Sequence, residues 1–359
     1  MTRPGDPDRD VNRENLVDWA RAVIAEADAL AGKTCVERHV SPGGIAIAAR
    51  FDDPVLAAAY CNRFRDAAPD AVEGIRVNVL TGRGMAQTGH WRDPAFDPRE
   101  FHAALKADGL RAAYPFADGV WRLFDIRSRV GLQWCSTTGD LPPWDGSAPL
   151  RQHLHWTLEE AGMRLAHAAT LGLKDRGIVL FGRGGAGKSG TTLAGLAAGL
   201  STVGDDYIAL ANKPVPLARP LFRTVKQDRE GLARVPGLAS RTMRNDVNWR
   251  GKVEFDPTGI FAGALVDRLP IKAVVLPSIA HVAKPALIPT RPQAAMLALM
   301  TSNLHQFAGE PDGGMPFFAA FLKDLPCFRL DLSPDAVRNG NLLREFVERL
   351  PGEEARPPA

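Results

Sequence analysis

The spacing of apolar residues predicts an amphipathic helix near the start of the chain. From Glu14 to about Leu30 these residues recur at helical intervals, whereas residues 1–13 are polar and proline-rich. The pattern then predicts strands at 45–51, 74–80, 120–127 and 130–135, and a helix at 54–67. We therefore expect a small α+β domain over 14–145 that follows a disordered tail at 1–13.

A run of turn-forming residues at 140–149 marks the clearest domain boundary. After it, the pattern predicts a helix at 151–167, a buried strand at 178–181, a glycine-rich loop, a helix to about Leu200 and a strand at 207–210. Further strands are expected at 252–255, 271–276 and 327–330, with helices at 293–300, 317–325 and from 334 onward. This alternation predicts a second domain of α/β class over 146–350, followed by a disordered tail at 351–359.

The glycine-rich loop carries the strongest chemical signal in the chain. Its sequence is Gly182-Arg183-Gly184-Gly185-Ala186-Gly187-Lys188-Ser189, a full match to the P-loop (Walker A) pattern G-x-x-x-x-G-K-[ST], between a predicted strand and a predicted helix. Glycines allow the loop to curve until its backbone N–H groups point at phosphate oxygens. Lys188 can then reach the β and γ phosphates, and the Ser189 hydroxyl can bind Mg²⁺. We therefore expect residues 182–190, including Gly190, to bind ATP and magnesium.

Two adjacent carboxylates, Asp205 and Asp206, follow the helix after this loop, within Gly204-Asp205-Asp206-Tyr207. One of them could hold Mg²⁺ while the other accepts a proton from an attacking hydroxyl. A Gly-Asp-Asp sequence is also ordinary turn chemistry. Its place directly downstream of a phosphate-binding loop favours the functional interpretation.

Four segments together resemble a known family in their order and spacing. They are His167-Ala168-Ala169, the P-loop, Ala198-Gly199-Leu200 and residues 204–207. They look like the HPr kinase/phosphorylase-like P-loop serine kinases, which share the phosphoenolpyruvate carboxykinase-like nucleotide-binding fold. The resemblance covers the C-terminal part of the chain and does not extend to residues 1–140. It therefore implies a P-loop kinase domain preceded by a smaller α+β domain.

The resemblance also implies roles for individual residues. Asp205 would be the catalytic base, and Asp206 a metal-binding or orienting carboxylate. Lys188 would act on the transferred phosphate, and His167 would lie near the γ-phosphate and support the aspartate pair. Residues 222–226 and 251–254 look like lysine-bearing segments of the same group, although their lysines also fit a solvated surface. HPr itself is not implied as the substrate.

Composition and charge restrict the partners of the chain. Lys and Arg number 44 against 41 Asp and Glu, so the formal charge of +3 creates no overall field for a nucleic acid or a membrane surface. The four cysteines form no CxxC pair, which argues against a zinc cluster or a redox dithiol. No apolar stretch of about 18 residues occurs, and the first residues contain no apolar segment. We expect a cytoplasmic protein.

Three weaker patterns lie outside the P-loop and the aspartate pair. His153 and His155 are two residues apart in a predicted helix, so they do not share a face, and we expect surface or capping roles rather than a metal pair. Arginines concentrated at 219–250 could clamp a triphosphate or an acidic peptide, or belong to a solvated loop. Phe317, Phe318 and Phe321 have the spacing of core packing.

Two functions from different classes fit these patterns. The first is an ATP- and Mg²⁺-dependent kinase whose acceptor is a hydroxyl, either a serine of a peptide or protein or a small alcohol metabolite. The second is a nucleotide-dependent switch that changes how residues 14–140 engage a partner. Two adjacent aspartates favour the kinase, because a switch needs a water-positioning group rather than a base for a hydroxyl. Either protein is compatible with a homo-oligomer.

Overall fold

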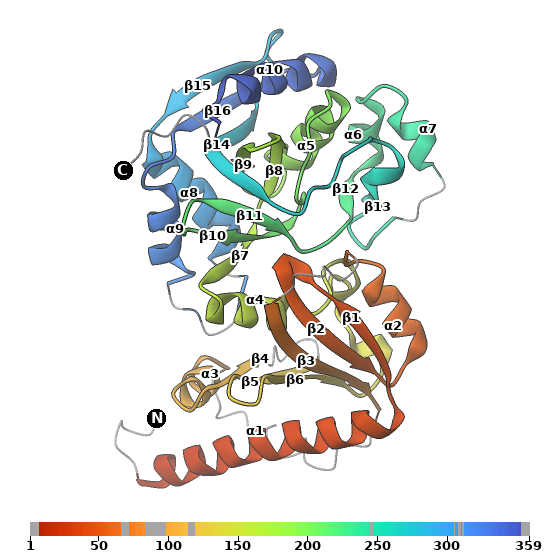
Figure 1. Cartoon of the computed structure of the whole chain (residues 1–359), viewed down its shortest axis with the longest axis vertical. Helices are drawn as coiled ribbons and strands as arrows, with labels where there is room; N and C mark the ends of the chain where they lie inside the picture. Colours follow the sequence, from red (N-terminus) through yellow and green to blue (C-terminus); the bar gives the residue numbers. More distant parts are fainter. Residues whose placement is uncertain are drawn as a thin grey trace. The chain divides into compact units, whose positions relative to one another are not determined.

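The chain forms two units (Figure 1). One contains residues 1–160 and 307–311, and the other contains residues 161–306 and 312–359. The computed structural model describes residues 7–65, 72–82, 98–113, 119–243, 247–304, 306–307, 310 and 312–352. The predicted boundary near residue 146 lies one helix before the observed division, because helix α4 (Arg151–Glu160) packs against strands of the first unit.

The described residues of the first unit form a six-stranded mixed sheet. Its order is β1 (Val36–Val40), β2 (Ile45–Phe51), β3 (Val72–Thr81), β6 (Val130–Cys135), β5 (Trp121–Asp125) and β4 (Leu110–Ala113). Strand β3 runs parallel to both β2 and β6, and the other pairs are antiparallel. The predicted hairpin of β5 and β6 is therefore confirmed.

Helices pack on both faces of this sheet, as two consecutive side chains of β5 that point to opposite faces show. Leu123 belongs to a buried cluster with α1 (Pro7–Thr34), whereas the ring of Phe124 stacks on Trp156 of α4. Helices α2 (Pro54–Cys61) and α3 (Pro98–Lys106) complete the unit, together with short 3₁₀ turns at Pro42–Gly44, Thr138–Asp140 and Asp145–Ser147.

Helix α1 begins earlier than the sequence pattern predicts. Residues 7–13, expected in the polar tail, are helical, since the backbone of a proline such as Pro7 suits a first helical turn. Helix α2 ends at Cys61, several residues before the predicted end. Residues 1–6 and 353–359, predicted as tails, lie outside the described residues.

The expectation of surface roles for His153 and His155 is wrong. Both side chains are fully buried, because the side chains of residues 152–158 are buried all round helix α4. The His153 ring fits against Gly131, where a Cβ atom would lie 2.7 Å from the ring. His155 stacks on Phe307 and lies 2.6 Å from a carboxylate oxygen of Glu310. These histidines therefore belong to the interior of the unit.

The second unit is organised around three parallel strands. Strand β14 (Leu269–Ile279) lies between β9 (Arg176–Leu180) and β16 (Cys327–Leu332) and runs parallel to both. Strands β8 (Ala169–Leu173) and β15 (Ala286–Thr290) are the antiparallel edges of this layer. The start of β14 also pairs with β11 (Leu217–Pro220), which continues antiparallel into β10 (Tyr207–Ala211) and β7 (Met163–His167). The fold is thus of mixed α/β class.

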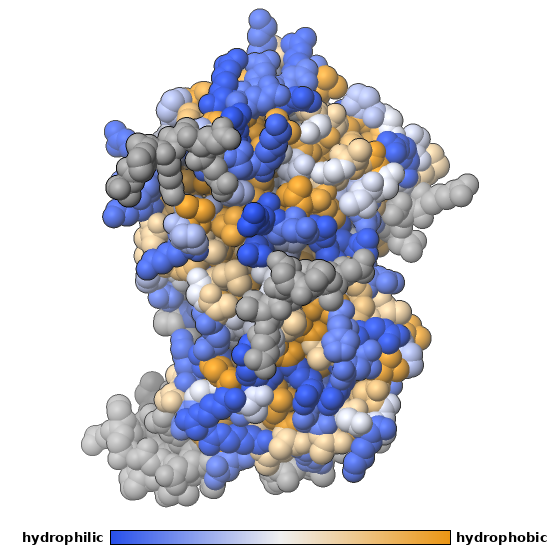
Figure 2. Space-filling view, in the orientation of Figure 1, coloured by the Kyte–Doolittle hydropathy of each residue, from blue (hydrophilic) through white to orange (hydrophobic). Residues whose placement is uncertain are grey.

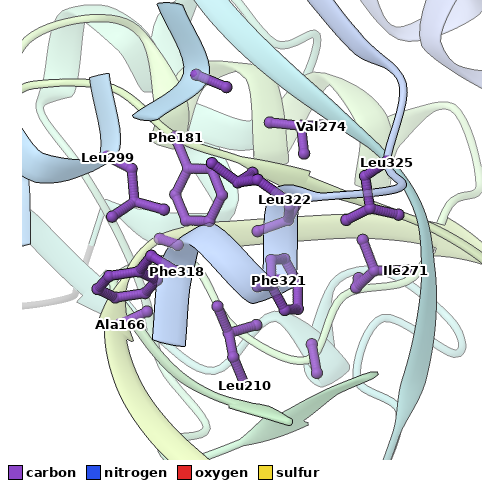
Figure 3. Close-up of a cluster of buried hydrophobic side chains, with 14 of the residues drawn as sticks. Ala166, Phe181, Leu210, Ile271, Val274, Leu299, Phe318, Phe321, Leu322 and Leu325 are labelled. Carbon is purple, nitrogen blue, oxygen red and sulfur yellow. The ribbon is translucent and has the colours of Figure 1, made fainter. Parts of the chain in front are cut away.

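Helices cover both faces of the parallel layer. Ile178 and Leu180 of β9 belong to a cluster with α10 (Ala336–Arg349), which lies beside α5 (Lys188–Ala197). Val179 and Phe181 point the other way, toward α8 (Pro292–Asn303) and α9 (Met315–Leu322), as Figure 3 shows for Phe181. The predicted core role of Phe318 and Phe321 is confirmed, since both rings are buried there, and Phe317 packs partly buried against the same cluster.

A smaller subdomain flanks α5. It consists of the two-stranded sheet β12 (Val225–Gln227) and β13 (Val253–Phe255), helices α6 (Arg229–Ala233) and α7 (Leu238–Thr242), and a 3₁₀ turn at Pro257–Gly259. Leu193 and Leu196 of α5 pack with Val225 and Val253 of this sheet. The subdomain therefore lies against the helix that begins with the P-loop lysine.

The sequence pattern wrongly extends the helix of residues 151–160 to His167. Helix α4 ends before Gly162, whose φ of 70° is a left-handed conformation that suits glycine at a helix end. Residues 163–167 form strand β7 instead, so His167 lies on a strand.

The surface mixes residue types. On the face in Figure 2, hydrophilic and hydrophobic side chains are interspersed. Among the described helices, none combines the length and the apolar character required to cross a membrane.

Candidate functional site

A pocket of about 480 Å³ lies at the carboxyl ends of the three parallel strands of the second unit. The P-loop follows β9, Ile279 ends β14, and Leu332 ends β16, and all three contribute to the pocket wall. The carboxyl edge of a parallel sheet is where α/β proteins commonly bind ligands. The volume lies within the roughly 300–1,000 Å³ of small-molecule sites.

The P-loop has the geometry that its sequence predicts. It connects β9 to α5, and Gly185 and Gly187 have φ values of 80° and 100°. A Cβ atom on Gly187 would lie 2.7 Å from the Leu332 side chain, so this position has neither the conformation nor the room for a larger residue. Lys188 and Ser189 begin α5, whose N-terminus faces the pocket, a favourable place for an anion.

Lys188 is buried and folds back over the loop. Its ammonium group donates a 2.6 Å hydrogen bond to the carbonyl oxygen of Gly182. Burial lowers the pKa of this amine, while the charges of Asp206 and Asp205 act in the opposite direction. The side chain thus spans the inside of the turn that a phosphate group would enter.

Strand pairing brings His167 beside the aspartate pair. His167 at the end of β7 is in register with Tyr207 at the start of antiparallel β10, and the backbone N–H of Ala168 donates to the carbonyl oxygen of Asp206. The imidazole Nε2 of His167 consequently lies 3.1 Å from Asp206 Oδ1. The structure thus joins the His167 and Asp206 segments that lie on either side of the P-loop in sequence.

Asp206 is a half-buried carboxylate with a partner on each oxygen. His167 Nε2 faces Oδ1, and the ammonium of Lys226 donates to Oδ2 at 2.8 Å. Burial alone would raise the pKa of Asp206, but Lys226 and His167 outweigh it and hold the pKa well below its ordinary value. Asp206 is therefore ionised and firmly oriented.

Asp205 lies deeper and is bound differently. Only 2% of the residue is exposed, and its Oδ2 accepts a hydrogen bond from the backbone N–H of Lys226 at 3.1 Å. Its Oδ1 has no hydrogen-bond partner among the described residues. Burial first, and then the Asp206 charge, raise the pKa of Asp205 to about 6 against the opposing effects of the Lys226 N–H and the nearby Ser189 hydroxyl. This oxygen is the one part of the pair that is buried and unsatisfied.

The strand pair β12–β13 supplies a further charged pair. Lys226 on β12 contacts Asp206 and also lies 3.8 Å from Glu254 on β13. Burial lowers the pKa of Lys226, but Asp206 and Glu254 outweigh this effect and raise it. His167, Asp206, Lys226 and Glu254 therefore form a continuous chain of polar contacts.

The donor set fits a magnesium ion held with phosphate oxygens. A buried carboxylate oxygen without a partner and the first-turn hydroxyl of Ser189 are hard oxygen ligands of the kind Mg²⁺ takes. Asp206, the predicted metal ligand, lines the same pocket, but both of its oxygens already contact cationic or ring nitrogens.

Some of the remaining predicted site residues line the pocket, and others lie behind it. Arg183, Gly184, Gly185, Gly187 and Gly190 line the pocket. Gly182 and Ala186 form the loop behind them, and a Cβ atom on Gly182 would lie 3.0 Å from that of Ala186. Of the arginines at 219–250, Arg234 and Arg250 line the pocket.

Sequence reasoning missed Asn303 at the end of α8. Its side-chain Oδ1 accepts a 2.7 Å hydrogen bond from the backbone N–H of His167 and thereby fixes the end of β7. No local pattern marks this asparagine. Lys226, by contrast, lies in a segment that the family resemblance indicates.

No model of a known protein family matches this chain, and no curated protein matches it significantly.

Proposed function

We propose that this protein is an ATP- and Mg²⁺-dependent phosphotransferase that moves the γ-phosphate to a hydroxyl acceptor, in the manner of the HPr kinase-like P-loop kinases that its motifs resemble. The observation that carries the proposal is the meeting of a P-loop with two carboxylates whose pKa values are shifted in opposite directions within one pocket. The acceptor is a serine of a peptide or protein, or a small alcohol.

Different groups of the chain have separate roles in the proposed reaction. Lys188 leaves the Gly182 carbonyl to neutralise charge on the β and γ phosphates, and the N-terminus of α5 holds the same oxygens. The apolar rim formed by Ile279, Leu332 and Pro334 suits the nucleoside. Magnesium, when bound, would neutralise charge on the β and γ phosphates.

In the transfer step, the acceptor oxygen forms a bond to the γ-phosphorus. The bond between that phosphorus and the β–γ bridging oxygen breaks, and ADP leaves with the electron pair. The acceptor proton passes to Asp205, whose pKa of about 6 is suited to a base near neutral pH. His167 and Lys226 hold Asp206 in place beside it.

A second division of roles follows from the position of Ser189. Asp205 has the unpartnered oxygen near this hydroxyl, so it can also serve as the carboxylate for magnesium, with Asp206 receiving the proton. A weakly basic Asp206 is compatible with this role, because phosphoryl transfer depends mainly on positioning and electrostatics.

The variants Asp205→Asn and Asp206→Asn distinguish the two assignments of the base and the magnesium-binding carboxylate. A third variant, Lys188→Ala, should lose nucleotide binding. We expect Asp205→Asn to retain ATP affinity and its magnesium dependence while transfer falls about 10²–10⁴-fold, the usual contribution of a general base. Calorimetry across a magnesium series and transfer of labelled γ-phosphate to peptide and metabolite pools measure both. A raised magnesium requirement in Asp205→Asn instead would assign Asp205 to the metal. Unchanged ATP binding and turnover in Lys188→Ala would overturn the proposed function.

The switch hypothesis stays an alternative with its own signature. A switch would hydrolyse ATP at a rate that no hydroxyl compound increases, whereas a kinase consumes ATP faster when an acceptor is present.

A further inference from the structure

The segment 247–252, here called the Trp249 loop, is held rigidly by its own hydrogen bonds. The backbone N–H of Asn248 donates to the carbonyl oxygen of Lys252 at 2.7 Å, and that of Gly251 donates to the carbonyl oxygen of Asn248 at 2.8 Å. The side-chain Oδ1 of Asn248 accepts from the N–H groups of Arg250 and Lys252. Gly251 has a φ of 70°, which suits glycine at this tight reversal. The loop is therefore shaped before any partner arrives.

This rigid loop presents an apolar surface to solvent. Trp249 is 47% exposed and Val247 is 50% exposed, and Met243 close by in sequence is 65% exposed. The guanidinium of Arg250 lies 4.5 Å from the centre of the Trp249 ring. Exposed aromatic and arginine side chains on a preorganised loop are typical of residues that dominate binding energy.

The loop is also continuous with the candidate active site. Arg250 and Lys252 line the pocket, whereas Trp249 lies outside it. The side-chain amide of Asn248 donates to Glu254 Oε1 at 2.6 Å, and Glu254 lies 3.8 Å from the Lys226 ammonium that binds Asp206. Trp249 therefore lies in the same loop as two residues of the pocket wall.

The positive charges of Arg250 and Lys252, on the pocket wall, favour a binding partner that carries negative charge. Among the described residues, no carboxylate lies within salt-bridge distance of Arg250 or Lys252. The acidic residues nearby are engaged, since Glu230 pairs with Arg234 and Asp228 caps α6. Two cations at the mouth of a phosphate-binding pocket attract an acceptor that carries negative charge.

We propose that the Trp249 loop docks the phosphate acceptor, and that this acceptor is an acidic peptide segment with an apolar side chain close to its serine or threonine. The apolar side chain packs on Trp249 and Val247, and the acidic residues meet Arg250 and Lys252. This inference rests on the proposed kinase function for its chemistry, but the docking surface can be tested without catalysis.

The binding test uses a short fluorescein-labelled peptide in which aspartates and glutamates surround a serine and a phenylalanine. Two counterparts carry lysines in place of the acids, or alanine in place of phenylalanine. Fluorescence anisotropy with the full-length, nucleotide-free protein measures affinity. We expect the acidic peptide to bind most tightly and Trp249→Ala to weaken it about 10- to 30-fold, as for a hot-spot aromatic residue.

Trp144→Ala is the matched control, because Trp144 is also exposed but belongs to the first unit. It should leave peptide affinity unchanged, and Trp249→Ala should leave ATP affinity unchanged. Equal affinity of the wild type and Trp249→Ala for the acidic peptide would overturn the docking surface, as would equal binding of the acidic and lysine peptides. Phosphorylation of small alcohols alone would also overturn it while leaving the kinase function intact. If the wild type bound no ATP, the proposed function would fail and anisotropy would still decide the docking surface.

Discussion

Asp205 and Asp206 are neighbours in the chain, yet their surroundings shift the pKa values of their carboxyl groups in opposite directions. Asp205 is buried with one oxygen unpartnered, whereas His167 and Lys226 contact the two oxygens of Asp206. Two adjacent acids with separated pKa values are suited to two different tasks at one pH. Burial and cation placement, rather than residue type, make the pair asymmetric.

The raised pKa of Asp205 has a consequence for stability. As pH rises from the ordinary value of 3.8 toward about 6, Asp205 ionises in the unfolded chain before it ionises in the folded protein. The free energy of unfolding should therefore fall over this window, by about 3 kcal/mol for this group, and level off above it. Asparagine at position 205 cannot ionise. We expect wild type to lose stability relative to Asp205→Asn across this range in urea unfolding at a series of pH values.

Asp206→Asn tests the opposite pH dependence of the free energy of unfolding. The lowered pKa of Asp206 contributes stability above its unfolded-state pKa, and this contribution is lost as pH falls through the folded value. A wild-type stability that tracks that of Asp205→Asn at every pH would contradict the raised pKa of Asp205.

At the scale of elements, α5 depends on its close packing against α10. Gly340 of α10 lies so near α5 that a Cβ atom there would be 2.3 Å from the carbonyl oxygen of Ala194. The helix that positions Lys188 and Ser189 is thus fixed by a glycine far along the sequence.

We expect Gly340→Ala to destabilise the protein by about 1–3 kcal/mol, because overpacking outweighs the roughly 1 kcal/mol that alanine normally gains over glycine in a helix. Displacement of α5 should also weaken ATP binding. Gly259→Ala is the matched control, since no heavy atom of the described residues beyond its two chain neighbours lies within 4 Å of the added Cβ. Thermal unfolding and calorimetry measure both effects, and equal behaviour of the two variants would argue against the packing constraint.

The elements that sequence could predict are those with a local signal. Strand β9, the P-loop and α5 follow from a buried run, a glycine pattern and helical spacing, all within residues 176–197. Gly162 also signalled the end of α4, but the apolar residues beyond it resemble a continued helix. Strand β12 has three residues and exists through its pairing with β13, so Lys226 acquires its place beside Asp206 from a distant segment.

At the scale of the whole molecule, all described residues that line the pocket belong to the second unit. Bound ATP and magnesium should therefore slow amide exchange at 182–191, 204–207 and 225–227, while the sheet of the first unit exchanges at its original rate. Hydrogen exchange of the intact chain with and without nucleotide tests this, with Lys188→Ala as the control. Equal protection of the first unit would favour the switch over the kinase.

Strand β14 lies between β9 and β16, and the P-loop glycine Gly187 packs against Leu332 at the end of β16. On the ribosome, the P-loop emerges long before the strand that completes its surroundings. The nascent chain therefore carries the full P-loop motif before the pocket around it exists. Under the proposed function, nucleotide would help the second unit fold only in the last stage of synthesis, once residues 327–339 have been released and β16 has paired with β14.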